Sequence, residues 1–150
     1  MSRLQKAIIV RIVLFAAVFL SGCVGLVRID LTGTWAGTLE WTDGPSTGFT
    51  SPISLDIVHE DRNVSGTVTL VGPGSEPFVL TISSGRTGAR SITLDASGTL
   101  DSVTPSIAVS LSLDGDFDAS SMSGTGSQTF SGNTYSFTWE LVRTSGPPEE

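Results

Sequence analysis

The stretch GTWAGTLEW, residues 33–41, decides the fold class of this chain. In an extended backbone its side chains alternate between two faces, so Trp35, Leu39 and Trp41 share one face while small or charged residues share the other. Alternation with a period of two residues is typical of a β-strand that buries one face. The sequence therefore predicts a strand over residues 33–41, with its tryptophans pointing into a core.

The same alternation recurs along the chain, and helix-forming runs are missing after residue 23. The predicted strands cover residues 33–41, 53–59, 64–70, 78–82, 92–96, 107–113, 122–130 and 135–143. Turns or loops with glycine and polar residues are expected at residues 60–63, 72–74, 84–88, 114–121 and 131–133. Short strands at regular spacing predict an all-β sandwich or barrel.

The eight predicted strands are joined mostly by short turns, which favours an eight-stranded antiparallel up-and-down barrel. A closed barrel leaves no strand edge exposed to solvent. Closure also makes the first and last strands antiparallel neighbours, so the start of one lies beside the end of the other. We therefore expect Trp35 to meet Arg143, and Leu39 to lie near Trp139.

The first 22 residues carry only three charges, from Arg3, Lys6 and Arg11. A basic segment followed by an apolar segment is the pattern of a secretory signal peptide. The uninterrupted apolar run, residues 12–20, has nine residues. That is well short of the roughly 20 residues that a transmembrane helix needs. We expect this segment to form a signal helix that is removed after export.

Directly behind this run stands Leu20-Ser21-Gly22-Cys23, which resembles the bacterial lipobox. The resemblance implies that Cys23 is lipidated before cleavage and then anchors the protein to the membrane. Cys23 is the only cysteine, so it cannot form an intramolecular disulfide, and lipidation gives it a use. The alternative is an ordinary cleaved signal with an incidental cysteine. The residue after Cys23 is Val24 rather than an aspartate. In a host with two membranes, this resembles the default signal that sorts a lipoprotein to the outer membrane.

These features divide the chain into four parts. They are a lipoprotein signal peptide at residues 1–22, the lipidated cysteine with a short tether at 23–31, a barrel at 32–144, and a disordered tail at 145–150. A domain of this size supports a single modest core, and we expect a monomer.

The net charge limits the partners of the processed chain. Without residues 1–22, five arginines and no lysine stand against fifteen acidic residues, a formal charge of −10. This balance disfavours nucleic acid and anionic lipid headgroups, because both are bound through basic patches. We therefore expect the lipid, not the protein surface, to hold the domain to the membrane. A single histidine leaves little material for a histidine metal site, and no cofactor is expected.

Two short motifs resemble those of a known superfamily. Residues 33–35 in the first predicted strand and Arg143 in the last resemble the structural signature of the calycins, which include lipocalins, avidins and certain bacterial metalloprotease inhibitors. Residues 31–35 look like an avidin opening, and residues 64–67 and 122–125 are similar to hairpin motifs of bacterial lipocalin-like lipoproteins. The resemblance implies a barrel in which the tryptophan packs at the closed end and the arginine covers it. It implies a packing pair and no activity.

The acidic stretch Asp114–Asp118 alternates carboxylates as a calcium loop does. It lacks the glycine of an EF-hand loop at the sixth position, where Ala119 stands, and the glutamate at the twelfth, where Thr125 stands. We therefore expect a solvated hairpin loop, whose aspartates favour turn geometry, and no metal site.

His59 lies close in sequence to Asp56, Glu60 and Asp61. A carboxylate beside an imidazole can support acid–base chemistry, but no Gly-x-Ser-x-Gly motif accompanies this histidine. At a strand end next to a turn, we expect it to be a partly exposed structural residue. The protein is therefore expected not to be an enzyme.

The inward-facing aromatic residues are the better functional candidates. An eight-stranded barrel either fills itself with side chains or holds one small ligand, and the many large inward residues favour a filled core. A ligand, if there is one, is expected to enter at the end opposite Trp35 and Arg143. The candidate pocket consists of Trp41, His59, Tyr135, Phe137 and Trp139.

Together these features predict a non-enzymatic, lipid-anchored protein of the bacterial cell envelope. Its expected activity is to bind a small apolar molecule or an envelope lipid at the mouth of the barrel. The alternatives are a protein-interaction module, such as a protease inhibitor, and a structural surface lipoprotein. The segment from Val24 to Leu31 is short for reaching a protease cleft, which counts against an inhibitor that acts through an extended N-terminus.

Overall fold

The computed structural model describes residues 28–71, 76–101 and 105–146. The predicted signal helix, the lipobox with Cys23, and the end of the predicted tail lie outside these ranges. No helix within them is long and apolar enough to cross a membrane. The strands are β1 (Gly33–Trp41), β2 (Thr50–Glu60), β3 (Asn63–Val71), β4 (Pro77–Thr87), β5 (Ser91–Leu100), β6 (Ile107–Phe117), β7 (Ser121–Phe130) and β8 (Asn133–Ser145).

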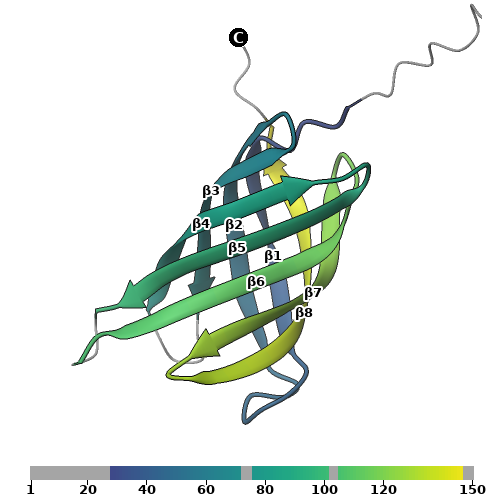
Figure 1. Cartoon of the computed structure of the whole chain (residues 1–150). Helices are drawn as coiled ribbons and strands as arrows, with labels where there is room; N and C mark the ends of the chain where they lie inside the picture. The colour runs from purple at the N-terminus through teal and green to yellow at the C-terminus, as the bar shows by residue number, and fades with distance from the viewer. Residues whose placement is uncertain (1–27, 72–75, 102–104, 147–150) are drawn as a thin grey trace, which may run out of the picture.

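All eight strands form one closed antiparallel barrel, in the order β1 to β8 around its wall (Figure 1). The wall closes because β1 pairs with β8, and their register sets Trp35 opposite Arg143 and Leu39 opposite Trp139. The predicted all-β, up-and-down barrel is therefore confirmed. Because each strand reverses direction, one end of the barrel holds the start of β1, the end of β8 and the turns β2–β3, β4–β5 and β6–β7. The other end holds the remaining connections.

β4 is longer than the sequence predicts, and the turn expected at residues 84–88 is wrong. The strand continues to Thr87, and the turn follows it. The register shifts between Ile82 and Ser84, where two consecutive serines are exposed before Gly85 is buried again. Such a β-bulge breaks the period of two, so the second half of the strand does not look like one in the sequence.

β6 also continues through residues that were predicted to form a loop. Phe117 ends the strand with its side chain buried, while Asp114 and Asp116 lie on the outer face. Gly115 takes an inward position, where an added Cβ would lie 2.8 Å from the Trp139 ring. The alternation of apolar and polar residues is not visible in this part of the sequence, because Gly115 stands at an inward position and leaves room for the Trp139 ring. At the C-terminal end of the barrel, β8 extends one residue beyond the predicted bound of 144, to Ser145.

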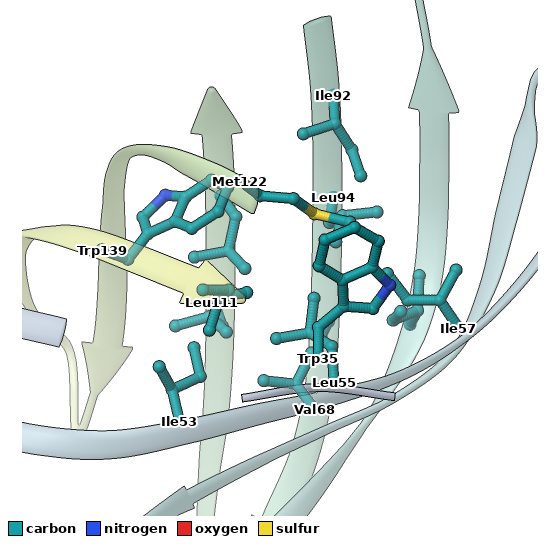
Figure 2. Close-up of a cluster of buried hydrophobic side chains, with 14 of the residues drawn as sticks. Trp35, Ile53, Leu55, Ile57, Val68, Ile92, Leu94, Leu111, Met122 and Trp139 are labelled. Carbon is teal, nitrogen blue, oxygen red and sulfur yellow. The ribbon is translucent and has the colours of Figure 1, made fainter. Parts of the chain in front are cut away.

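The interior of the barrel is filled by apolar side chains that alternate inward along every strand. The largest fully buried side chains are those of Trp35, Trp139 and Phe137, and both indoles point into the same interior (Figure 2). β7 makes room for them with small residues: a Cβ on Gly126 would lie 2.5 Å from the Phe137 ring. The Trp139 indole N–H donates to the carbonyl of Thr125 at 2.9 Å, so this buried polar group is satisfied. The filled interior leaves the two ends as the places to look for a site.

Candidate functional site

The end where β1 starts is closed by the chain itself, and we call it the plugged end. It is built from Leu31, Trp35, His59 and Arg143. Leu31 precedes β1 and is fully buried in the core. The Trp35 indole N–H donates to the carbonyl oxygen of Leu31 at 2.9 Å. This bond attaches the segment before β1, residues 28–32, to the barrel wall, and we call this segment the plug.

His59 holds the plug from the opposite side. Its Nδ1 accepts the backbone N–H of Leu31 at 3.2 Å, and its own backbone N–H donates to the Thr32 hydroxyl at 3.0 Å. Its Nε2 lies 3.0 Å from the Thr87 hydroxyl. Because Nδ1 is an acceptor, we assign the proton to Nε2, which then donates to Thr87. Both ring nitrogens are therefore engaged in structure.

Burial lowers the pKa of His59, since its side chain is only 4% exposed and the charged imidazolium would lose its hydration. The carboxylate of Asp30, 3.7 Å from Nδ1, acts in the opposite direction but is the smaller influence. The pKa of Asp30 is itself lowered, mainly by the backbone N–H of Thr32, which donates to it at 2.9 Å. The neutral imidazole is the form that accepts the Leu31 amide.

Arg143 covers the plugged end from β8. Its guanidinium carbon lies 4.7 Å from the centroid of the Trp35 ring, within the range of a cation–π interaction. Its Nη2 donates to the carbonyl oxygen of Asp30. This is the arrangement of tryptophan and arginine that the calycin resemblance implies.

The opposite end, which we call the mouth, is lined by Trp41, Tyr135 and Phe137. The rings of Trp41 and Phe137 meet edge to face, with centroids 5.3 Å apart and an interplanar angle of 75°. The β1–β2 loop, residues 42–49, folds against them: a Cβ on Gly44 would collide with the Tyr135 ring. The indole N–H of Trp41 is buried, and no residue in the described part of the chain accepts a hydrogen bond from it.

The five residues of the predicted pocket do not come together. Trp41, Tyr135 and Phe137 lie at the mouth, whereas Trp139 is packed in the core with its N–H satisfied. His59 lies at the plugged end, so placing it at the mouth was wrong. The reason is strand direction: β2 runs opposite to β1, and its pairing of Ile57 with Gly33 carries the end of β2 back to the start of β1.

The acidic stretch of β6 and the following turn does not gather around a single point. Asp118 accepts hydrogen bonds from the backbone N–H groups of Ser120 and Ser121, both at 2.7 Å, and from their hydroxyls at 3.0 and 2.8 Å. These bonds, first that from the Ser120 backbone, lower the pKa of Asp118 to about 2. Asp118 is thus a turn residue. Among the described residues, no three His, Cys, Asp or Glu side chains are placed to hold a metal ion.

On the described part of the chain, open pockets lie on the barrel wall and at the plugged end, outside the packed interior. A groove of about 430 Å³ on the wall of β6–β8 is lined mainly by serine and threonine, with Asp114. A larger pocket of about 980 Å³ lies at the plugged end. It is lined by Arg28, Ile29, His59, Asp61, Arg62, Asn63, Arg86, Thr87, Gly88, Ala89 and Phe117. This pocket was not predicted from the sequence, although the turns that share one end of the predicted barrel bring its arginines together.

Comparison with known proteins supports the fold alone. A redesigned β-barrel has a similar structure, with a TM-score of 0.54 and 15% sequence identity, over 77% of this chain and 92% of the other. No protein-family model matches the sequence. A comparison with curated proteins finds no relative either.

Proposed function

We propose that this chain is a non-enzymatic protein of the bacterial envelope, anchored by lipid on Cys23, whose barrel binds one small apolar molecule or lipid chain at the mouth. The observation that carries the binding proposal is the indole of Trp41, which is buried at its N–H without an acceptor among the described residues. A buried donor without a partner is costly unless a ligand or water accepts from it. A ligand with one acceptor oxygen on an apolar body would satisfy it.

The shape of the mouth limits the size of such a ligand. Phe137 and Trp139 are both 1% exposed, and they fill the barrel beneath Trp41. A ligand therefore rests at the rim, between the Trp41 ring and the 42–49 loop, and does not enter the interior. Small movements of this loop would be enough to admit it, because the loop is attached to β8 through few hydrogen bonds, including that from Ser136 N–H to the Asp43 carboxylate at 2.7 Å.

The anchor follows from Leu20-Ser21-Gly22-Cys23, directly behind an apolar export signal. Four residues lie between Cys23 and Arg28, where the described chain begins, and the five steps from one to the other span at most about 17 Å. A lipid on Cys23 would therefore hold the plugged end close to the membrane and leave the mouth facing away from it. In a host with two membranes, Val24 favours the outer membrane.

Two features support a role without catalysis. His59, the one histidine, has both ring nitrogens engaged by Leu31 and Thr87, so its imidazole is not free to exchange protons with a substrate. The Asp118 carboxylate is likewise occupied, because it accepts hydrogen bonds from backbone N–H groups of its own turn.

A protein-interaction module is the second candidate, and Phe49 favours it. This side chain is 58% exposed at the end of the 42–49 loop, where a large apolar group on the surface suits a protein partner. An inhibitor that acts through its N-terminal segment is less well supported, because Leu31 and Thr32 are held in the plug.

Native mass spectrometry of the mature protein, purified from its own host, tests both parts of the proposal. The mass of the N-terminal peptide should show acyl chains on Cys23, and the intact protein should retain a small apolar molecule. Trp41→Arg should abolish that retention. Val79→Arg, which places the same side chain on the exposed outer wall, should preserve it. An unmodified Cys23 would refute the anchor, and a wild-type protein without any ligand would refute binding at the mouth.

A further inference from the structure

We propose that the pocket at the plugged end binds the phosphate group of an anionic membrane phospholipid. The pocket is distinct from the mouth, since it lies at the opposite end of the barrel. Its volume of about 980 Å³ is ample for a lipid headgroup. The proposal rests on the charges, hydrogen-bonding groups and position of this pocket.

The lining of the pocket is basic in a chain that is acidic overall. Arg28, Arg62 and Arg86 contribute three positive charges, and Asp61 is the one carboxylate among the lining residues. His59 also lines the pocket and is held neutral by burial. The lining therefore carries a net charge of +2, which attracts an anion.

Two of these arginines have no ion-pair partner among the described residues. Arg28 lies 3.1 Å from the Asp61 carboxylate, so its charge is already paired. Within the described ranges, no carboxylate lies within 4.0 Å of Arg62 or Arg86. A guanidinium presents donors in a planar fork that matches two oxygens of a phosphate. Arg62 and Arg86 are therefore the groups that would hold the anion, and the Asn63 amide on the same lining can add a donor.

The backbone holds these two arginines beside each other. Arg62 lies in the β2–β3 turn and Arg86 near the end of β4, so they are far apart in sequence. Asn63 pairs in register with Arg86, and the N–H of Thr87 donates to the carbonyl oxygen of Arg62 at 2.9 Å. The bulge in β4 gives this end of the strand the register that it needs to reach the turn. A position set by backbone hydrogen bonds favours a built site over a chance meeting of flexible side chains.

The distribution of charge over the barrel favours a membrane as the source of the phosphate. All five arginines of the described residues lie at the plugged end: in the segment before β1, in the β2–β3 turn, near the end of β4, in the β4–β5 connection and near the end of β8. Around the mouth, the described charged residues are all acidic. They are Glu40, Asp43, Glu76 and Asp101. The plugged end also holds carboxylates, namely Asp30, Glu60, Asp61, Asp116 and Asp118, so its formal charge is close to zero, whereas that of the mouth is −4. An anionic membrane surface therefore repels the mouth and not the plugged end, where the basic lining of the pocket can face it.

The preference for a headgroup over a dissolved phosphate rests on the proposed lipid anchor. With Cys23 in the bilayer, the tether of at most about 17 Å brings the arginines within reach of the headgroup layer. A headgroup in the same membrane is then present at a high effective concentration, so modest intrinsic affinity is sufficient. The net charge of the chain suggested that headgroups are disfavoured, but a net charge does not describe how the charges are distributed.

The test uses the mature protein extracted from membranes, with an R62Q/R86Q double variant and R90Q as the matched control. Arg90 lies at the same end of the barrel but does not line the pocket. Each protein is titrated calorimetrically with inorganic phosphate. It is then reconstituted in phosphatidylcholine vesicles with or without phosphatidylglycerol, and amide hydrogen exchange is followed at residues 61–63 and 86–89. Thermal melting checks that each variant is folded.

Wild type and R90Q should bind phosphate, and phosphatidylglycerol should slow amide exchange at both segments. R62Q/R86Q should weaken phosphate binding by about tenfold or more, since it removes two charge-assisted contacts, and should lose the protection. Three results would overturn the proposal: no binding by the wild type, equal binding by R62Q/R86Q, or phosphate binding without protection by phosphatidylglycerol, which would assign the pocket to a dissolved anion. The calorimetric result does not depend on the anchor, so an unmodified Cys23 would refute the anchor while leaving the pocket intact.

Discussion

At the plugged end, the chain fills its own barrel: Leu31 is fully buried, with its carbonyl oxygen bound by Trp35 and its N–H bound by His59. At the mouth, the 42–49 loop folds against the rim, but the indole N–H of Trp41 has no acceptor among the described residues. Both ends carry aromatic side chains, and they differ in whether the indole N–H groups of those rings have an acceptor. At the plugged end, the buried donor without a partner among the described residues is Nε of Arg143, which lies over the Trp35 ring.

This difference separates structure from candidate function more clearly than residue type does. All three tryptophans of the barrel face inward. The indole N–H groups of Trp35 and Trp139 each donate to a backbone carbonyl oxygen at 2.9 Å, whereas that of Trp41 has no acceptor among the described residues. A side chain with every polar group paired is explained by packing. A side chain with an unpaired donor at an opening can bind a ligand, and this distinguishes Trp41 from the other two tryptophans.

The largest effect should come from removing the tryptophan of the plugged end. Trp35→Ala should lower the free energy of unfolding by about 3–5 kcal/mol, because it empties a fully buried site and leaves Arg143 without its ring. Trp41→Ala should cost less than half as much, since Trp41 is only partly buried. Urea denaturation of both variants measures the difference. Equal losses would show that the two ends are equally important to stability.

The next effect tests whether the segment before β1 belongs to the core. Leu31→Ala should cost about 2–4 kcal/mol, as expected for truncating a fully buried leucine. Ile29→Ala is the matched control, because Ile29 packs against the same core but is only partly buried. Its cost should be clearly smaller in the same denaturation experiment. If Leu31→Ala is as mild as the control, the segment does not plug the barrel.

A smaller effect should follow from protonation of His59. Its pKa is lowered in the folded protein by burial, so the unfolded chain binds the proton more readily. Stability is therefore full above the ordinary pKa of 6.5 and should fall as the pH drops below it. The charged groups that face His59 are Asp30, Arg28 and Asp61. The pKa of Asp30 is lowered, so its carboxylate stays ionised in this range.

Melting temperatures between pH 8 and pH 5 would measure this loss, with His59→Gln as the control. Glutamine keeps an acceptor and a donor but does not titrate. The variant should be less stable at neutral pH and should lose the dependence near pH 6. An unchanged pH profile in His59→Gln would assign the dependence to another group.

The smallest effect concerns the β6–β7 turn, which lies at the plugged end but outside the plug. Asp118→Ala removes an acceptor of four hydrogen bonds and should lower the melting temperature less than the changes above. The carboxyl pKa is lowered from 3.8 to about 2, so its contribution is present above pH 4 and is lost as the pH falls to about 2. Acid melts of wild type and Asp118→Ala should converge in that range. Profiles that stay parallel would contradict this role.

The fold could be predicted because a period of two residues is visible wherever one face is buried. It was visible in β1, β3 and the first part of β6, and counting the strands was enough to predict closure. The periodicity failed where a bulge shifted β4 after Ile82, and where Gly115 took an inward position beside Trp139. In both places the cause lies in contacts with another strand, which the local sequence does not contain.

The candidate sites were less predictable, because they depend on which residues share an end of the barrel. His59 was assigned to the mouth, although the antiparallel direction of β2 places it beside Leu31. Arg62 and Arg86 gave no local signal, since each is one charge in a polar turn or strand. Their proximity arises from the pairing of Asn63 with Arg86.

Amide hydrogen exchange of the mature protein tests the contrast between the two ends most directly. The Leu31 amide, bound by the buried His59 ring, should exchange as slowly as the amides of β1, because its exchange requires unfolding of the barrel. The amides of Asp43, Gly44, Ser46 and Thr47, in the loop at the mouth, should exchange far faster. A Leu31 amide that exchanges as fast as that loop would contradict the account, because the end beside Trp35 would then be open.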